Sequence, residues 1–216
     1  MTSSFLYPFL EAEERDAGPL MADLAASADA KAAISRRLRT DTLRDQADAL
    51  SATAAALAEV FARGGRLLVV GNGGSSTDAA GIAGLFTSPP TGAPLPARSL
   101  VTDPAVLTAL ANDVGFDVVF ARQVLAYGRR GDALLGISTS GGSVNVLRAF
   151  AAARSAGLIT VGVAGYGGGA LKDSPDVAHC LTVSSDSVHR TQEAQAALVL
   201  ALWSRVQDAL ERSVSG

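Results

Sequence analysis

The chain has 216 residues and a formal net charge of −3, with 18 basic residues, 21 acidic residues and one cysteine. This length suits one α/β domain, or one domain with helical extensions, and allows a full hydrophobic core. The basic residues are scattered, which argues against direct nucleic-acid binding, and the single Cys180 excludes a disulfide framework or a cysteine metal cluster. We find no signal peptide and no apolar run of the roughly 20 residues that span a bilayer, so we expect a cytoplasmic protein without membrane attachment.

Two helices are expected before residue 64. The first would span about residues 7–28, broken or kinked at Gly18-Pro19, and the second about residues 34–62. This part is rich in Ala and carries apolar residues over much of its surface, which favours packing against a partner subunit. We therefore predict a helical extension for oligomerisation over residues 1–63 and a separate domain over residues 64–216.

Short apolar runs alternate with helical stretches in the rest of the chain. The runs are residues 66–70, 97–101, 133–137, 158–163 and 179–183. Strands that alternate with helices in this way are typical of a parallel sheet with helices on both faces. We expect a doubly wound α/β fold that closes with a helix over residues 188–210. Its ligand site should lie in the loops at the carboxyl ends of the strands.

A loop rich in hydroxyl groups, which we call the hydroxyl loop, covers residues 138–143 (Ser-Thr-Ser-Gly-Gly-Ser) between an expected strand and an expected helix. The first N–H groups of a helix have no intrahelical partner, and the helix dipole places partial positive charge there. Such N–H groups and hydroxyls can hold a phosphate dianion without Lys or Arg. The alternative is a serine-rich turn in which Ser143 is an ordinary N-cap.

A second loop, which we call the glycine loop, covers residues 71–75 (Gly-Asn-Gly-Gly-Ser) after the first expected strand. It lacks the third glycine of a dinucleotide-binding turn, and neither loop has the lysine of a nucleoside-triphosphate loop. We favour an arrangement in which Asn72, Ser75 and the N–H groups of this loop face the hydroxyl loop, so that both bind one small phosphorylated ligand. A serine hydrolase is disfavoured because the sequence around Ser138 does not fit the Gly-x-Ser-x-Gly nucleophile elbow.

Together with Ala111-Asn112-Asp113 and Arg190-x-Gln192-Glu193, the two loops resemble the sugar isomerase (SIS) domain family in its phosphoheptose isomerase branch. The resemblance implies a five-stranded parallel sheet, a homotetramer, and sugar-phosphate sites built where subunits meet. It also implies, by matching position, a set of residues that bind the phosphorylated sugar: Asn72, Gly73, Gly74, Ser75, Asp103, Ser138, Thr139, Ser140, Ser143 and Gln192. For Asp103 an equally good interpretation is the N-cap of a helix that begins at Pro104.

The chain departs from the family pattern at the positions that carry its chemistry. In the phosphoheptose isomerase branch, the helix after the glycine loop carries a metal-binding His and, four residues later, a Glu that also transfers protons; here these residues are Gly81 and Leu85. A His of the family's final helix corresponds to Leu200. An aldose–ketose isomerisation needs a base and an acid, and leucine is neither. We therefore expect no bound metal and no cofactor.

Three functions stay open. The one we favour is a sugar-phosphate-binding protein that lacks the standard isomerase chemistry and has a regulatory or assembly role, with a protein partner that the sequence does not identify. The second is an isomerase of sedoheptulose 7-phosphate or a related ketose phosphate, in which His189 acts with Glu193 or Asp78 as a rearranged acid/base pair. The third is an unrelated nucleotide-binding α/β enzyme. For His179, in the last expected strand, a structural role is favoured.

Overall fold

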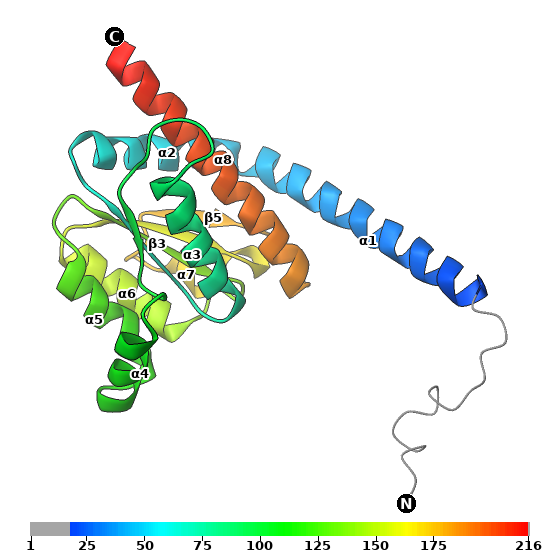
Figure 1. The fold of residues 1–216 in the computed structure, drawn as a ribbon, viewed down its shortest axis with the longest axis horizontal. Coiled ribbons are helices and arrows are strands. Elements are labelled where there is room, and N and C mark those ends of the chain that lie inside the picture. The colour runs from blue at the N-terminus through cyan, green and yellow to red at the C-terminus, as the bar shows by residue number, and fades with distance from the viewer. Residues whose placement is uncertain (1–17, 216) are drawn as a thin grey trace, which may run out of the picture. The chain divides into compact units, whose positions relative to one another are not determined.

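A computed structural model describes residues 18–215 of the chain (Figure 1). The chain divides into two compact units, residues 1–37 and residues 38–216. In the first unit, the described residues form the beginning of helix α1 (Gly18–Asp45), and four large apolar side chains there are exposed: Leu20, Met21, Leu24 and Ile34. The division into an extension and a domain at residue 63 stays a prediction.

The expected division between the N-terminal helices is wrong. α1 starts at Gly18, with Pro19 in its first turn, where proline is tolerated, and it continues through residues 29–33, which contain neither Gly nor Pro. The expected part before Gly18 lies outside the described residues. The chain turns instead at Gln46, before α2 (Ala47–Ala62). The Gln46 side chain accepts a hydrogen bond of 3.0 Å from the N–H of Thr182, which connects this turn to the sheet.

The second unit is built on a five-stranded parallel sheet, in agreement with the expected doubly wound fold. The strands are β1 (Leu67–Gly71), β2 (Ala97–Ser99), β3 (Ala133–Ser138), β4 (Ile159–Ala164) and β5 (His179–Thr182). Their order across the sheet is β2-β1-β3-β4-β5. The chain order therefore reverses between β1 and β3, and this reversal opens a crevice outside the carboxyl ends of those strands.

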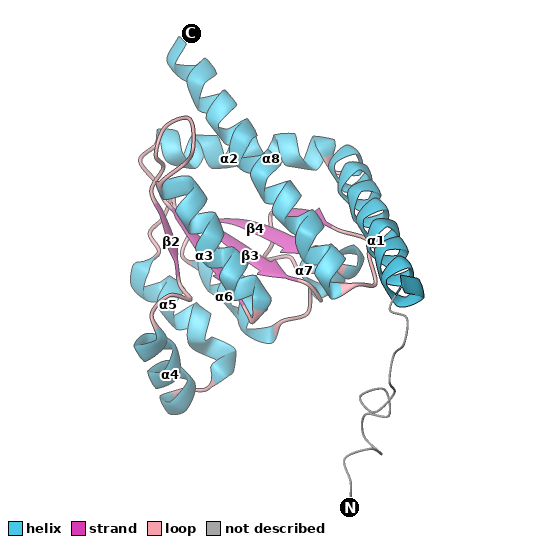
Figure 2. Cartoon of the chain, turned by 45° about the vertical axis from the view of Figure 1, so that its right-hand side comes forward, coloured by secondary structure: helices cyan, strands magenta, loops and turns pink. Residues whose placement is uncertain are grey.

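Helices cover both faces of the sheet (Figure 2). After α2 and the first strand, the helices are α3 (Gly74–Thr87), α4 (Pro104–Asp113), α5 (Val119–Tyr127), α6 (Val144–Ser155), α7 (Gly169–Asp173) and α8 (Val188–Ser215), with single 3-10 turns η3 (Phe116–Val118) and η4 (Tyr166–Gly168). On one face α2, α3 and α8 bury Leu57, Phe86 and Leu198; on the other, α5, α6 and α7 bury Phe120, Phe150 and Leu171. None of the described helices has the length and apolar character needed to cross a membrane.

A buried ionic cluster connects β1 and β3 at the amino ends of the strands. Asp132, only 4% exposed, precedes β3. Its carboxylate accepts hydrogen bonds from the backbone N–H groups of Arg66, at 3.1 Å, and Arg129, at 3.0 Å, and from Nε of Arg66, at 3.1 Å. Arg66 also donates to the carbonyl oxygen of Tyr127. These bonds offset the cost of burying the carboxylate, and they hold the edge opposite the crevice.

Candidate functional site

The hydroxyl loop lies at the carboxyl end of β3, and its serine side chains converge. Oγ of Ser138 is 3.0 Å from Oγ of Ser143 and 3.4 Å from Oγ of Ser140, which in turn accepts a bond of 3.2 Å from the N–H of Gly142. Ser143 occupies the N-cap position of α6, but its side chain makes no capping hydrogen bond. The hydroxyls therefore gather at the start of a helix, in an arrangement suited to an anion, instead of closing the helix end.

A second layer of backbone and side chains supports the hydroxyl loop. Gln195 of α8 is completely buried and donates to the carbonyl oxygens of Ser138, at 3.3 Å, and Val163, at 3.2 Å. The carbonyl of Gly141 accepts a bond of 2.8 Å from the N–H of Leu171 in α7. Sequence reasoning missed Gln195, whose partners lie far away along the chain.

The glycine loop follows β1 and the hydroxyl loop follows the neighbouring strand β3, and an amide pair connects the glycine loop to the first turn of α6. The side chains of Asn72 and Asn145 exchange two hydrogen bonds, of 2.7 and 2.9 Å. Asn145 is the second residue of α6 and is 4% exposed. Its position directly after the hydroxyl loop was a signal that the sequence analysis did not use. Asn72 therefore has a fixed orientation at the crevice.

The glycine loop also contacts the final helix. Ser75 is buried in the first turn of α3, directly after Gly73 at the N-cap and Gly74. A Cβ atom on Gly74 would lie 2.3 Å from Nε2 of Gln192, so the Gln192 side chain of α8 lies directly against the glycine loop and would have to move if residue 74 carried a side chain. The structure thus brings Gln192, from the Arg-x-Gln-Glu sequence, against the glycine loop.

Asp103 caps a helix, as one of its two interpretations predicts. It is the N-cap of α4, and its carboxylate accepts a hydrogen bond of 3.1 Å from the N–H of Val106. A contact between Asp103 and a sugar stays a prediction. Thr139, which follows Ser138 in the hydroxyl loop, is half-buried.

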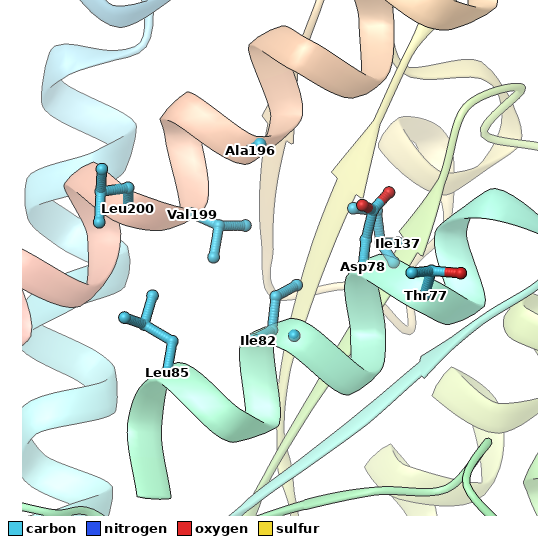
Figure 3. A pocket seen from close by; sticks show the side chains of 9 residues that line it. Thr77, Asp78, Ile82, Leu85, Ile137, Ala196, Val199 and Leu200 are labelled. Atoms are coloured by element: carbon cyan, nitrogen blue, oxygen red, sulfur yellow. The ribbon is translucent and has the colours of Figure 1, made fainter. Parts of the chain in front are cut away.

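A groove of about 230 Å³ lies between α3 and α8 (Figure 3). Its lining residues are Thr77, Asp78, Gly81, Ile82, Leu85, Ile137, Ala196, Val199 and Leu200. The three positions where the sequence departs from the family pattern, Gly81, Leu85 and Leu200, thus face one space. Apart from Thr77 and Asp78, the groove is apolar.

Asp78 is the ionisable group of this groove. Burial raises the pKa of its carboxyl, and a hydrogen bond with Gln192 opposes that rise. The Oδ2 atom is buried and has no hydrogen-bond partner. A buried acceptor without a donor is unfavourable, so this oxygen is suited to accept a hydrogen bond from a ligand hydroxyl.

The two residues expected to form a rearranged acid/base pair lie elsewhere on α8. His189 and Glu193 are exposed, and neither lines the groove. His179 lies on β5, where burial lowers its pKa and favours the neutral form, in keeping with a structural role. Among the described residues no three His, Cys, Asp or Glu side chains group together in a way that would hold a metal ion, so the donor set does not fit the metal that the resemblance implies.

We expect Asp78→Asn to stabilise the chain in a pH-dependent way. Because its pKa is raised in the folded state, the folded chain holds the Asp78 proton more tightly than the unfolded chain, and the buried carboxylate costs stability as the pH rises through the folded pKa. The gain in urea midpoint should therefore be larger at pH 7 than at pH 4. Asp117→Asn, at an exposed site, is the control; an equal gain for Asp78→Asn at both pH values would contradict the assignment.

These features define a class: a doubly wound α/β protein with a candidate phosphate site at the point where its strand order reverses. Residues 32–165 match the family model of the SIS domain. The chain is 49% identical over 154 residues to the phosphoheptose isomerase of Roseiflexus sp. (strain RS-1), covering 70% of this chain and 77% of that protein. It is 45% identical over 168 residues to the phosphoheptose isomerase of Chlorobaculum parvum, covering 76% and 80%.

Solved structures agree with this comparison. The phosphoheptose isomerase GmhA from Neisseria gonorrhoeae superposes with a TM-score of 0.79 at 33% identity, covering 86% of this chain and 99% of that one. A phosphoheptose isomerase from Francisella tularensis gives 0.77 at 32% identity, covering 85% and 98%. The chain belongs to the SIS domain family, in its phosphoheptose isomerase branch.

Proposed function

We propose that the chain binds a phosphorylated sugar and uses this binding in a regulatory or assembly role, without the standard isomerase chemistry of its branch. Membership of a family of sugar-phosphate isomerases supports the ligand class. The observation that carries the proposal is the apolar groove lined by Gly81, Leu85 and Leu200. By the family resemblance, these positions correspond to the acid, base and metal-binding residues of the branch.

The hydroxyl loop would hold the phosphate. Ser138, Ser140 and Ser143 offer three hydroxyls at the start of α6, where the helix dipole favours negative charge. Thr139 and Ser75 are further donors beside them. Asn72 of the glycine loop and Gln192, which lies against Gly74 of that loop, would bind sugar hydroxyls.

Isomerisation moves a proton between adjacent carbons, so a base must reach one carbon and an acid the neighbouring oxygen. The groove offers one carboxyl, Asp78, and otherwise hydrocarbon and Thr77. The groove therefore lacks the acid and base pair that the standard isomerase chemistry of the branch needs. Subunit assembly as a homotetramer, a cytoplasmic location and an interaction with another protein belong to the same proposal.

A second candidate function is an isomerase with a rearranged acid/base pair. Asp78 favours it, since its raised pKa and its buried, unpartnered Oδ2 are typical of a proton-transfer group. His189 or Glu193 would have to supply the second group from outside the groove.

One experiment separates the two candidates. We expect sedoheptulose 7-phosphate to bind saturably in calorimetry, and we expect no deuterium incorporation and no aldose when it is incubated with the protein in D₂O. Exchange that Asp78→Asn or His189→Ala abolishes would instead establish the isomerase.

The double variant Ser138→Ala/Ser140→Ala tests the phosphate site. Because hydrogen bonds to a charged group contribute about 1.5–3 kcal/mol each, we expect the affinity for sedoheptulose 7-phosphate to fall by roughly two orders of magnitude. Ser155→Ala, at the exposed far end of α6, is the matched control and should bind normally. Unchanged affinity in the double variant would contradict the role of the hydroxyl loop.

A further inference from the structure

We propose that the groove between α3 and α8 receives an apolar substituent of the bound ligand. The chain would then select phosphorylated sugars whose end remote from the phosphate is deoxygenated or carries an alkyl or aryl group. This inference rests on the proposed function, in which the hydroxyl loop holds the phosphate.

The lining of the groove favours such a group. The side chains of Ile82, Leu85, Val199 and Leu200 line it (Figure 3). Gly81 also lines it, and a Cβ atom there would meet nothing within 4 Å. A sugar hydroxyl placed among these side chains would give up its bonds to water without a new partner. An alkyl or aryl group would gain from leaving water.

The size of the groove is adequate for a ring. Its volume is about 230 Å³. An engineered apolar cavity of about 150 Å³ is large enough to bind benzene. The volume of the groove is therefore sufficient for a phenyl group or an alkyl chain of similar size.

The groove leads from the glycine loop, and this proximity supports an occupant that is part of the same ligand. Gln192 of α8 lies against Gly74 of the glycine loop, and Ala196, one turn further along α8, lines the groove. On α3, Asp78 of the groove likewise lies one turn after Gly74. At this junction the unpartnered Oδ2 of Asp78 provides one acceptor for a ligand hydroxyl, and beyond it the surface is apolar.

Three sugar phosphates that differ at one end test this selection. Glucose 6-phosphate, methyl β-glucoside 6-phosphate and phenyl β-glucoside 6-phosphate share the phosphate and differ at the anomeric carbon. We expect calorimetry on the full chain to show at least about tenfold tighter binding of the phenyl than of the methyl compound. Phenyl β-glucoside without phosphate should bind weakly, because the hydroxyl loop then has no anion.

Two matched pairs of variants test whether the preference for the phenyl compound arises in the groove. Gly81→Leu fills the groove and should abolish the preference for phenyl over methyl, whereas Gly84→Leu, also on α3 with open space at its Cβ but outside the groove, should keep it. Leu200→Gln should reduce the preference by roughly fivefold. Leu125→Gln alters a similarly exposed helical leucine outside the groove and should not change it.

The outcomes distinguish this inference from the proposed function. Equal affinities for the phenyl and methyl compounds would overturn the inference and leave phosphate binding established. No binding of any of the three phosphates would overturn both. If the preference survived Gly81→Leu, the phenyl group would bind outside the groove and the inference would be wrong. If Leu200→Gln changed the oligomeric mass and left the preference intact, the groove would be a contact between copies of the chain, and the inference would again be wrong.

Discussion

Replacement of Asp132 by alanine is expected to lower the free energy of unfolding by about 3 kcal/mol. The Asp132 side chain is 6% exposed, and its carboxylate accepts three hydrogen bonds, two of them from backbone N–H groups that precede β1 and β3. Its removal leaves these two N–H groups and Nε of the partly buried Arg66 without their acceptor. For a chain of this size the melting temperature should fall by roughly 6–12 °C, measured by differential scanning calorimetry.

An exposed ion pair provides the control for Asp132. Asp117 lies 3.6 Å from Arg148, and both side chains are more than half exposed. Such pairs contribute about 0–1 kcal/mol, so Asp117→Ala should change the melting temperature by less than about 3 °C. Equal shifts for the two alanine variants would show that the buried cluster does not stabilise the sheet as we infer.

The strands and their parallel direction could be predicted because both faces of the sheet are covered. Each strand is then a short run of apolar residues, and the runs that begin at Leu67 and Ala133 are buried over their whole length. The break between α1 and α2 could not be predicted in the same way. Its position depends on Gln46, whose hydrogen-bond partner Thr182 lies 136 residues further along the chain.

Some residues of the candidate site could likewise be predicted from the sequence, and others could not. The two loops could be predicted from local composition, because glycines and hydroxyls between a strand and a helix are typical of a phosphate-binding loop. Asn145 and Gln195 have ordinary surroundings in the sequence, and their roles arise only when α6 and α8 pack on the sheet. The family resemblance marks Gly81 and Leu200 as departures, but their shared apolar groove follows from the packing of α3 against α8.

The geometry of the hydroxyl loop depends on Gly141, and Gly141→Ala is expected to damage both the fold and the binding of phosphate. Gly141 has φ +64°, a left-handed conformation that costs alanine about 1 kcal/mol. A Cβ atom there would also lie 2.1 Å from the carbonyl oxygen of Gly168, which belongs to the backbone of η4. The two segments would have to separate, and this would strain the 2.8 Å bond from the N–H of Leu171 to the Gly141 carbonyl.

We therefore expect Gly141→Ala to lower the free energy of unfolding by about 3 kcal/mol, measured by urea denaturation, and to weaken sedoheptulose 7-phosphate binding at least about tenfold. Gly142→Ala is the matched control for stability. The nearest atom to a Cβ on Gly142 is Oγ of Ser140 at 3.8 Å, an ordinary contact, so its stability should change by less than about 0.5 kcal/mol. Equal losses of stability in the two variants would contradict the view that close packing of Gly141 against Gly168 sets the shape of the hydroxyl loop. Weak binding by a fully stable Gly141→Ala protein would place the effect in the loop alone.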